Sequence, residues 1–297
     1  MGRSFKKVIY VLMPFLAYYV VHDMTRFFMM YVLQLISSKN AGVYSYIRAH
    51  DTFVSGFISL LDMLLGALVL IILMKRDEEE LSIWDYVNLN GISFYRKDRI
   101  HPAWFSWVLL TIQAVSMALG INILIKLSGL MEISSYSETS GAQYSIPVWF
   151  GLLLYGVISP GVEELLFRLI FYGRMKRRFH IGIAVVVSSM FFGLYHRNLV
   201  QGIYGFAMGM LMCLACEYVH TVIGALLMHS AANLTVYLLG ITGVLGKLDS
   251  PVCCIIFICI GCLTVVAEIF YSRQSVRRFG VIEGVDHVGC FYVDPLL

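Results

Sequence analysis

Charged side chains are scarce in this sequence. Asp, Glu, Lys and Arg make up 14% of its 297 residues, hydrophobic residues make up 59%, and the mean hydropathy is +0.78. Soluble domains carry about 25% charged residues, so this composition excludes an ordinary soluble fold. We therefore expect an all-α bundle of a polytopic membrane protein. The net charge is only +3, and the basic residues cluster beside apolar runs, so the charge indicates no nucleic-acid partner.

Sequence signatures of several hydrolase classes are also absent. The chain has no His-Glu-x-x-His pair for zinc, no Gly-x-Ser-x-Gly elbow and no Gly-x-Gly-Asp motif. Classical zincin, serine and intramembrane aspartyl mechanisms lose support. The Cys-x-x-Cys pairs at 213–216 and 259–262 lie in apolar runs. There a small apolar side chain explains a cysteine more simply than a metal or a disulfide does.

Eight apolar runs predict eight membrane-spanning helices, because about 17 to 25 residues cross ~30 Å of hydrocarbon. The runs are 8–36, 53–74, 102–127, 147–173, 181–196, 199–219, 221–240 and 251–271. Basic clusters at the start, at 174–178 and at 273–278 place both termini in the cytoplasm by the positive-inside rule. The polar segment 75–101 is then a cytoplasmic loop, and the Lys- and Arg-free segment 128–145 an outside loop. We treat 1–297 as one membrane domain.

Two adjacent acids and one arginine interrupt the fourth run. Glu163, Glu164 and Arg168 are its only charged side chains, and charges at membrane depth usually face a partner or a water-filled cavity. Glu164 and Arg168 are four apart on one helix face, which predicts an ion pair. Glu163 points about 100° away and lacks that partner, so it stays free for chemistry. An ion cluster that only joins helices is the alternative.

Two histidines occur in patterns that could join Glu163. His196 follows Phe192 by four positions, and His229 precedes Asn233 by four, so its imidazole shares a helix face with the carboxamide. With Glu163 they supply a base, a second imidazole and hydrogen-bond donors, the groups needed to activate water and stabilise an oxyanion. We estimate depth by counting residues from the cytoplasmic ends of the predicted helices at about 1.5 Å per residue. This places Glu163 and His229 at a similar depth in the membrane, and it places His196 further from the cytoplasmic side.

The same groups offer a metal mechanism as an alternative. Glu163, His196 and His229 could hold zinc, because two imidazoles and one carboxylate form a known catalytic ligand set. A metal would take His229 from the face that it shares with Asn233. We therefore favour a site without a cofactor, with zinc as the alternative.

Polar groups also interrupt the first two runs. His22, Asp23 and Arg26 lie in the first run and Asp62 lies in the second. A polar pair between helices explains them more simply than catalysis does. We therefore expect an interhelical Asp/Arg pair to join the first two spanning helices.

Three motifs, in order on successive apolar helices, carry a family resemblance. They are Glu163-Glu164-x-x-x-Arg168, Phe192-x-x-x-His196 and His229-x-x-x-Asn233. Together they resemble the CPBP family of intramembrane proteases, which includes the Ras-converting CAAX proteases and the bacteriocin-processing and self-immunity (Abi) proteins. The resemblance covers about 147–240 and implies a four-helix catalytic core. It implies that Glu163 activates water with His196, that His229 and Asn233 form an oxyanion hole, and that Glu164 and Arg168 orient the core.

We therefore predict an intramembrane endopeptidase whose substrate is a leader-bearing peptide, a signalling peptide or another membrane protein. Nothing identifies a prenyl substrate, and the final Asp-Pro-Leu-Leu is not a CAAX box. The size and compact loops indicate a bacterial plasma membrane. A non-proteolytic scaffold or immunity protein of the same fold is the alternative. A proton-coupled transporter is a third reading, and it would require broken helices, for which 160–161 is the one candidate break.

Overall fold

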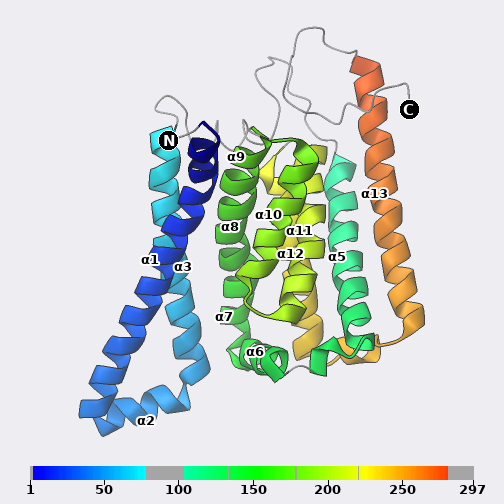
Figure 1. The fold of residues 1–297 in the computed structure, drawn as a ribbon. Coiled ribbons are helices and arrows are strands. Elements are labelled where there is room, and N and C mark those ends of the chain that lie inside the picture. The colour runs from blue at the N-terminus through cyan, green and yellow to red at the C-terminus, as the bar shows by residue number, and fades with distance from the viewer. Residues whose placement is uncertain (1–2, 78–103, 133, 178, 220, 280–297) are drawn as a thin grey trace.

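The computed structural model describes residues 3–77, 104–132, 134–177, 179–219 and 221–279. Across these residues the regular structure is entirely helical, and they contain no strand. Seven of their helices are long and apolar enough to cross a membrane, and a further apolar helix is shorter. Figure 1 shows the long helices running side by side through one bundle. The prediction of an all-α integral membrane protein is confirmed.

The helices agree with the predicted apolar runs to within a few residues, except at the C-terminal end of the last run. In chain order the elements are α1 (Arg3–Lys39), α2 (Ala41–Ala49), α3 (Asp51–Asp77), α5 (Trp104–Leu127), η1 (Leu130–Glu132), α6 (Ser134–Ser145), α7 (Val148–Leu153), η2 (Leu154–Ile158), α8 (Ser159–Glu164), η3 (Leu165–Tyr172), α9 (Gly173–Lys176), α10 (Ile181–Tyr195), α11 (Leu199–Val219), α12 (Val222–Ile241), η4 (Leu245–Lys247) and α13 (Pro251–Phe279). The loop predicted at 75–101 lies mostly outside the described residues.

The segment 128–145, predicted as a loop, is largely helical instead. It contains η1 and α6, and α6 lies across one end of the bundle (Figure 1). Tyr136 packs against the main hydrophobic core, and the Tyr144 ring stacks on Tyr237 of α12 with centroids 6.2 Å apart. These tertiary contacts stabilise a helix that its Ser- and Gly-rich sequence does not favour.

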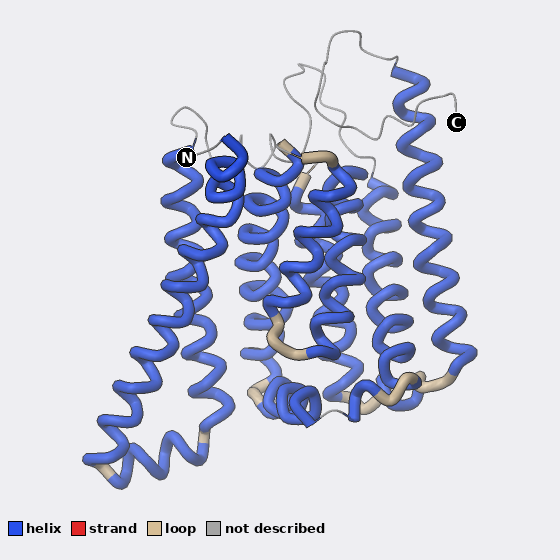
Figure 2. The backbone as a smooth tube through the Cα atoms, viewed as in Figure 1, coloured by secondary structure: helices blue, strands red, loops and turns tan. Residues whose placement is uncertain are grey.

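Helix α10 corrects the prediction of eight full-length spans. It has 15 residues, about 22 Å at 1.5 Å per residue, less than the ~30 Å of hydrocarbon. The helix ends at Tyr195 with His196 as its C-cap, and Arg197 follows with a φ of 54°, the one positive φ among the described non-glycine residues. A left-handed residue after the last turn ends a helix. Figure 2 shows the α10–α11 connection as a loop within the height of the neighbouring helices.

The fourth spanning helix carries the two glutamates. Elements α7 to α9 form one continuous helix, Val148–Lys176, so Pro160 does not break it. The π-helical segments η2 and η3 flank α8 on both sides. Proline removes a backbone donor and clashes with the carbonyl four residues before it, and η2 takes up that irregularity. Single π-helical turns are frequent at functional sites.

Close packing between helices brings α12 to this region. A Cβ at Gly156 would lie 2.5 Å from Leu234 Cδ2 of α12. Small residues allow membrane helices to approach in this way. The main hydrophobic core is built where α1, α3, α5, α8, η3, α10, α11 and α12 meet, with residues such as Leu166, Met208 and Met228 fully buried. The glutamates of α8 therefore lie inside the protein.

Candidate active site

Glu163 is buried on α8 with one oxygen satisfied and one not. Its exposed fraction is 5%. The hydroxyl of Ser159, one helical turn earlier, donates a hydrogen bond to Oε1. Oε2 is buried without a hydrogen bond to any described group and lies 3.7 Å from His229 Nε2. Ser159 is thus a partner of Glu163 that the sequence-based interpretation, which considered only Arg168, did not include.

Glu164 pairs with Arg168, as the spacing predicts. Arg168 Nη1 donates to Glu164 Oε1 at 3.2 Å, and both residues are 2% exposed. The guanidinium also donates to the Gly209 carbonyl and the Met212 sulfur of α11, and it lies 4.1 Å from the Phe192 ring centroid. This ion pair is desolvated, and the loss of one partner from such a pair is costly.

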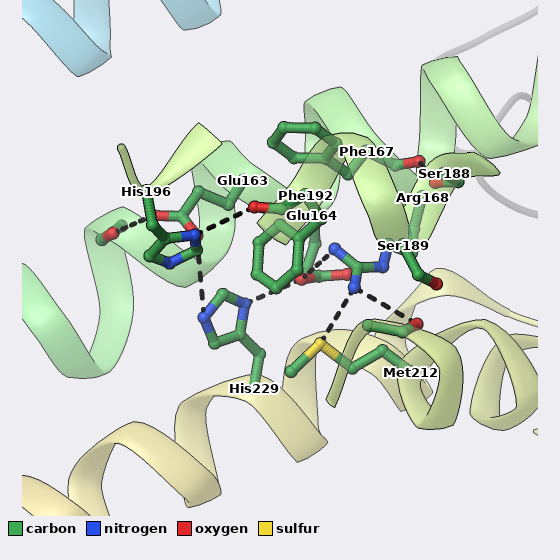
Figure 3. A network of polar contacts seen from close by, with 12 residues as sticks. Glu163, Glu164, Phe167, Arg168, Ser188, Ser189, Phe192, His196, Met212 and His229 are labelled. Atoms are coloured by element: carbon green, nitrogen blue, oxygen red, sulfur yellow. Dashed lines mark hydrogen bonds and ion pairs between the residues drawn. The ribbon is translucent and has the colours of Figure 1, made fainter. Parts of the chain in front are cut away.

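His229 of α12 connects the two glutamates. Its Nδ1 lies 2.7 Å from Glu164 Oε1. An ionised carboxylate only accepts hydrogen bonds, so Nδ1 carries the hydrogen. The opposite nitrogen, Nε2, then faces Glu163, as Figure 3 shows. Glu164 thus accepts from both Arg168 and His229, a contact across the bundle that no local spacing predicts.

His196 caps the C-terminus of α10 beside the same group. Its Nδ1 donates to the Phe192 carbonyl at 2.9 Å, since a carbonyl oxygen only accepts, and this leaves Nε2 available. In Figure 3 its ring lies next to Glu163. The depth difference expected from residue counting does not separate these groups.

Phe192 is the aromatic centre of the cluster. Its ring meets the edges of the His196 and His229 rings at centroid distances of 5.1 and 5.5 Å, with interplanar angles of 89° and 84°. Arg168 lies over the same ring. Phe192 therefore packs against the guanidinium and both imidazoles, while Arg168 and His229 meet at the same Glu164 oxygen.

Asn233 lies one turn beyond His229 on α12 and hydrogen-bonds to a different element. Its Nδ2 donates to the Tyr155 carbonyl of η2 at 3.1 Å. An amide nitrogen carries two hydrogens, so one remains for another acceptor. Asn233 thus ties α12 to η2, the π-helical segment that precedes α8, through a hydrogen bond.

Sequence reasoning missed Ser159 and Tyr155. Ser159 could have been found, because it precedes Glu163 by four positions, the same spacing that predicted the Glu164–Arg168 pair. The Tyr155 contact depends on a backbone carbonyl and on the rotation of α12, neither of which has a sequence signal.

The zinc ligand set given as the alternative is not assembled as a metal site in the described residues. Among the described residues, no group of three or more His, Cys, Asp or Glu side chains is placed to hold a metal ion. His229 Nδ1 is directed to Glu164 and His196 Nδ1 to a carbonyl, so each imidazole has only Nε2 left. Cys213 and Cys216 are buried free thiols.

The fold and this cluster define a polytopic helical membrane protein with glutamate, histidine and arginine buried among its spanning helices. Residues 145–235 match the model of the type II CAAX prenyl endopeptidase Rce1-like family. The match spans all seven predicted site residues. The chain therefore carries a domain of the Rce1-like CAAX protease family, and the resemblance drawn from the three motifs is confirmed. Searches of curated proteins and of solved structures returned no match.

Proposed function

We propose that the protein is an intramembrane endopeptidase in which Glu163 activates water. The observation that carries this proposal is the buried Oε2 of Glu163, which has no hydrogen-bond partner among the described groups and lies 3.7 Å from His229 Nε2, with the His196 ring beside the same glutamate (Figure 3). A buried carboxylate oxygen without a partner is costly. A reacting water held between Glu163 and His196 would satisfy it.

The chemistry would proceed as follows. Glu163 takes a proton from the water while the water oxygen attacks the carbonyl carbon of the scissile peptide bond. The tetrahedral intermediate carries negative charge on the former carbonyl oxygen. His229 and Asn233 donate hydrogen bonds to it. Protonated Glu163 then gives its proton to the leaving nitrogen, and the C–N bond breaks.

The charges of the cluster suit His229 as a hydrogen-bond donor to the oxyanion. Two ionised carboxylates and one guanidinium leave one negative charge, which a protonated His229 would balance. Glu164 holds His229 Nδ1 at 2.7 Å, so the second hydrogen of an imidazolium would be on Nε2. Arg168 and Phe192 would keep Glu164 in place. The division between a reacting Glu163 and an orienting Glu164 follows.

The substrate would be a membrane-associated protein or peptide, cleaved near the membrane. The family match supports a polypeptide substrate. We infer a bacterial plasma membrane and cytoplasmic termini from the loop charges and compact loops.

Glu163→Gln tests the proposal. Membranes containing the wild-type chain or the variant are compared by quantifying membrane peptides with new termini. Cleavage is expected to disappear in the variant, because an amide keeps the shape of the carboxyl group but cannot take a proton. The variant should still insert and fold, since its amide oxygen still accepts from Ser159. Retained turnover in folded Glu163→Gln would overturn the assignment.

A further inference from the structure

A second polar cluster lies between α1, α3 and the α10–α11 loop, outside the catalytic cluster described above. His22 Nε2 lies 3.3 Å from Asp62 Oδ1, and Arg26 Nη1 lies 3.9 Å from Asp62 Oδ2. These contacts confirm the expected interhelical pair. Asp23 accepts from Arg197 at 2.8 Å, so the cluster also contacts the residue that follows His196.

Three charged side chains of this cluster are exposed. The side-chain exposed fractions are 47% for Asp23, 51% for Arg26 and 63% for Arg197. Asp23 and Arg26 lie near the middle of the candidate span Val8–Lys39. A charged side chain exposed at that depth would be costly against lipid, and such groups face water-filled cavities instead.

The α10–α11 loop gives a second, independent reason to infer a water-filled cavity at this place. Helix α10 is too short to cross the hydrocarbon, and its loop lies within the height of the neighbouring helices (Figure 2). Non-helical backbone at membrane depth is tolerated only where it is buried in protein or lines a water-filled cavity. Arg197 of this loop is largely exposed, so the cavity alternative applies to it.

We propose that α1 and the α10–α11 loop line a water-filled vestibule that opens beside the catalytic cluster. Asp23, Arg26 and Arg197 form its wall, with Asp62 and His22 buried behind them. Its occupants are water and an unwound segment of polypeptide. An extended peptide exposes backbone donors and acceptors, which need polar partners at membrane depth.

A chain of polar groups joins the vestibule to the candidate active site. The Tyr18 ring lies 5.5 Å from the His22 ring, and its hydroxyl is 3.1 Å from the Tyr195 hydroxyl. Tyr195 directly precedes His196, and their ring centroids are 5.7 Å apart. Because its wall includes Arg197, the residue that follows His196, the vestibule would supply the water that Glu163 activates, a role that rests on the proposed endopeptidase function.

Cysteine accessibility in vesicles tests the vestibule without any assay of activity. Arg26→Cys and Arg197→Cys are treated with a membrane-impermeant sulfonated methanethiosulfonate, with the reagent present on both sides. Only a thiolate reacts, and a thiol in hydrocarbon stays protonated. The unsubstituted chain gives the background from its own cysteines.

The controls lie at the same depth. Met24 and Phe28 are two residues before and after Arg26 on the opposite face of α1, and they are 62% and 61% exposed. Leu194, 67% exposed, serves the same purpose for Arg197. A lipid-soluble maleimide shows that each introduced cysteine can be labelled.

We expect Arg26→Cys and Arg197→Cys to react at least about ten-fold faster than Met24→Cys, Phe28→Cys and Leu194→Cys. Equal rates across the five variants, whether all slow or all fast, would overturn the vestibule. Modification at position 26 should also stop turnover, whereas modification at position 24 should not. If Glu163→Gln retained turnover, the proposed function would fail while the labelling contrast stood.

Discussion

Replacement of Glu164 by glutamine separates an orienting glutamate from a reacting one. Glu164 Oε1 accepts from Arg168 at 3.2 Å and from His229 at 2.7 Å, and both hydrogen bonds are buried. Loss of one partner from a buried ion pair costs about 3 to 5 kcal/mol, because the other charge is left uncompensated. We therefore expect Glu164→Gln to lower the free energy of unfolding by about 3 to 5 kcal/mol and to lose activity as well.

Glu163→Gln is the matched control on the neighbouring residue. The glutamine amide oxygen still accepts the hydrogen bond from Ser159. The Glu163 carboxylate lies 3.7 Å from His229 Nε2, whereas the Glu164 carboxylate lies 2.7 Å from His229 Nδ1, so Glu163 has the weaker contact with this imidazole. We expect this variant to be destabilised by about 1 kcal/mol or less while turnover disappears completely. The measurement is unfolding in mixed micelles titrated with denaturing detergent, followed by tryptophan fluorescence.

A double-mutant cycle attributes the destabilisation to the ion pair. Arg168→Met removes the guanidinium, so Glu164→Gln in that background no longer leaves a buried cation without its partner. The double variant should be more stable than the sum of the two single effects predicts, by about 0.5 to 3 kcal/mol. Equal stability of Glu163→Gln and Glu164→Gln would refute the proposed division of roles.

Three further predictions concern the chemistry. His229→Ala and Asn233→Ala should each lower turnover roughly 100- to 1000-fold, with little change in substrate binding; normal turnover in Asn233→Ala would remove that residue from the oxyanion hole. Ser159→Ala should lower turnover about ten- to hundred-fold because it removes the hydrogen bond to Glu163, and Ser159→Thr should restore it. Turnover should survive prolonged chelation, whereas about one zinc per chain, removed in parallel with turnover, would establish the zinc alternative.

The helices could be predicted because a membrane leaves few choices for the backbone. Each spanning segment must satisfy its own N–H and C=O groups, so an apolar run of sufficient length predicts a helix. The runs at 199–219 and 221–240 became α11 and α12 almost unchanged. Helix α6 was missed because its stability comes from tyrosines that pack against other elements, such as Tyr144 on Tyr237.

The site could be predicted only where its contacts are local. Glu164 and Arg168 meet because four residues make about one helical turn, and sequence alone gives that. The His229–Glu164 hydrogen bond joins residues 65 positions apart and depends on how α8 and α12 rotate and slide against each other. The depth of His196 could not be predicted by counting residues, because such counting assumes that every helix crosses the whole membrane, whereas α10 is short.

One rule, that a charge at membrane depth faces protein or water, singled out both polar clusters without telling them apart. Burial separates them. Arg168 is 2% exposed and is surrounded by Glu164, Phe192 and α11, so its partners are protein groups. The Arg197 side chain is 63% exposed although Asp23 pairs with it, so protein alone does not enclose it. A hydrolytic site inside a membrane needs both environments, a dry one to hold its carboxylates in place and a wet one to supply the water that it consumes.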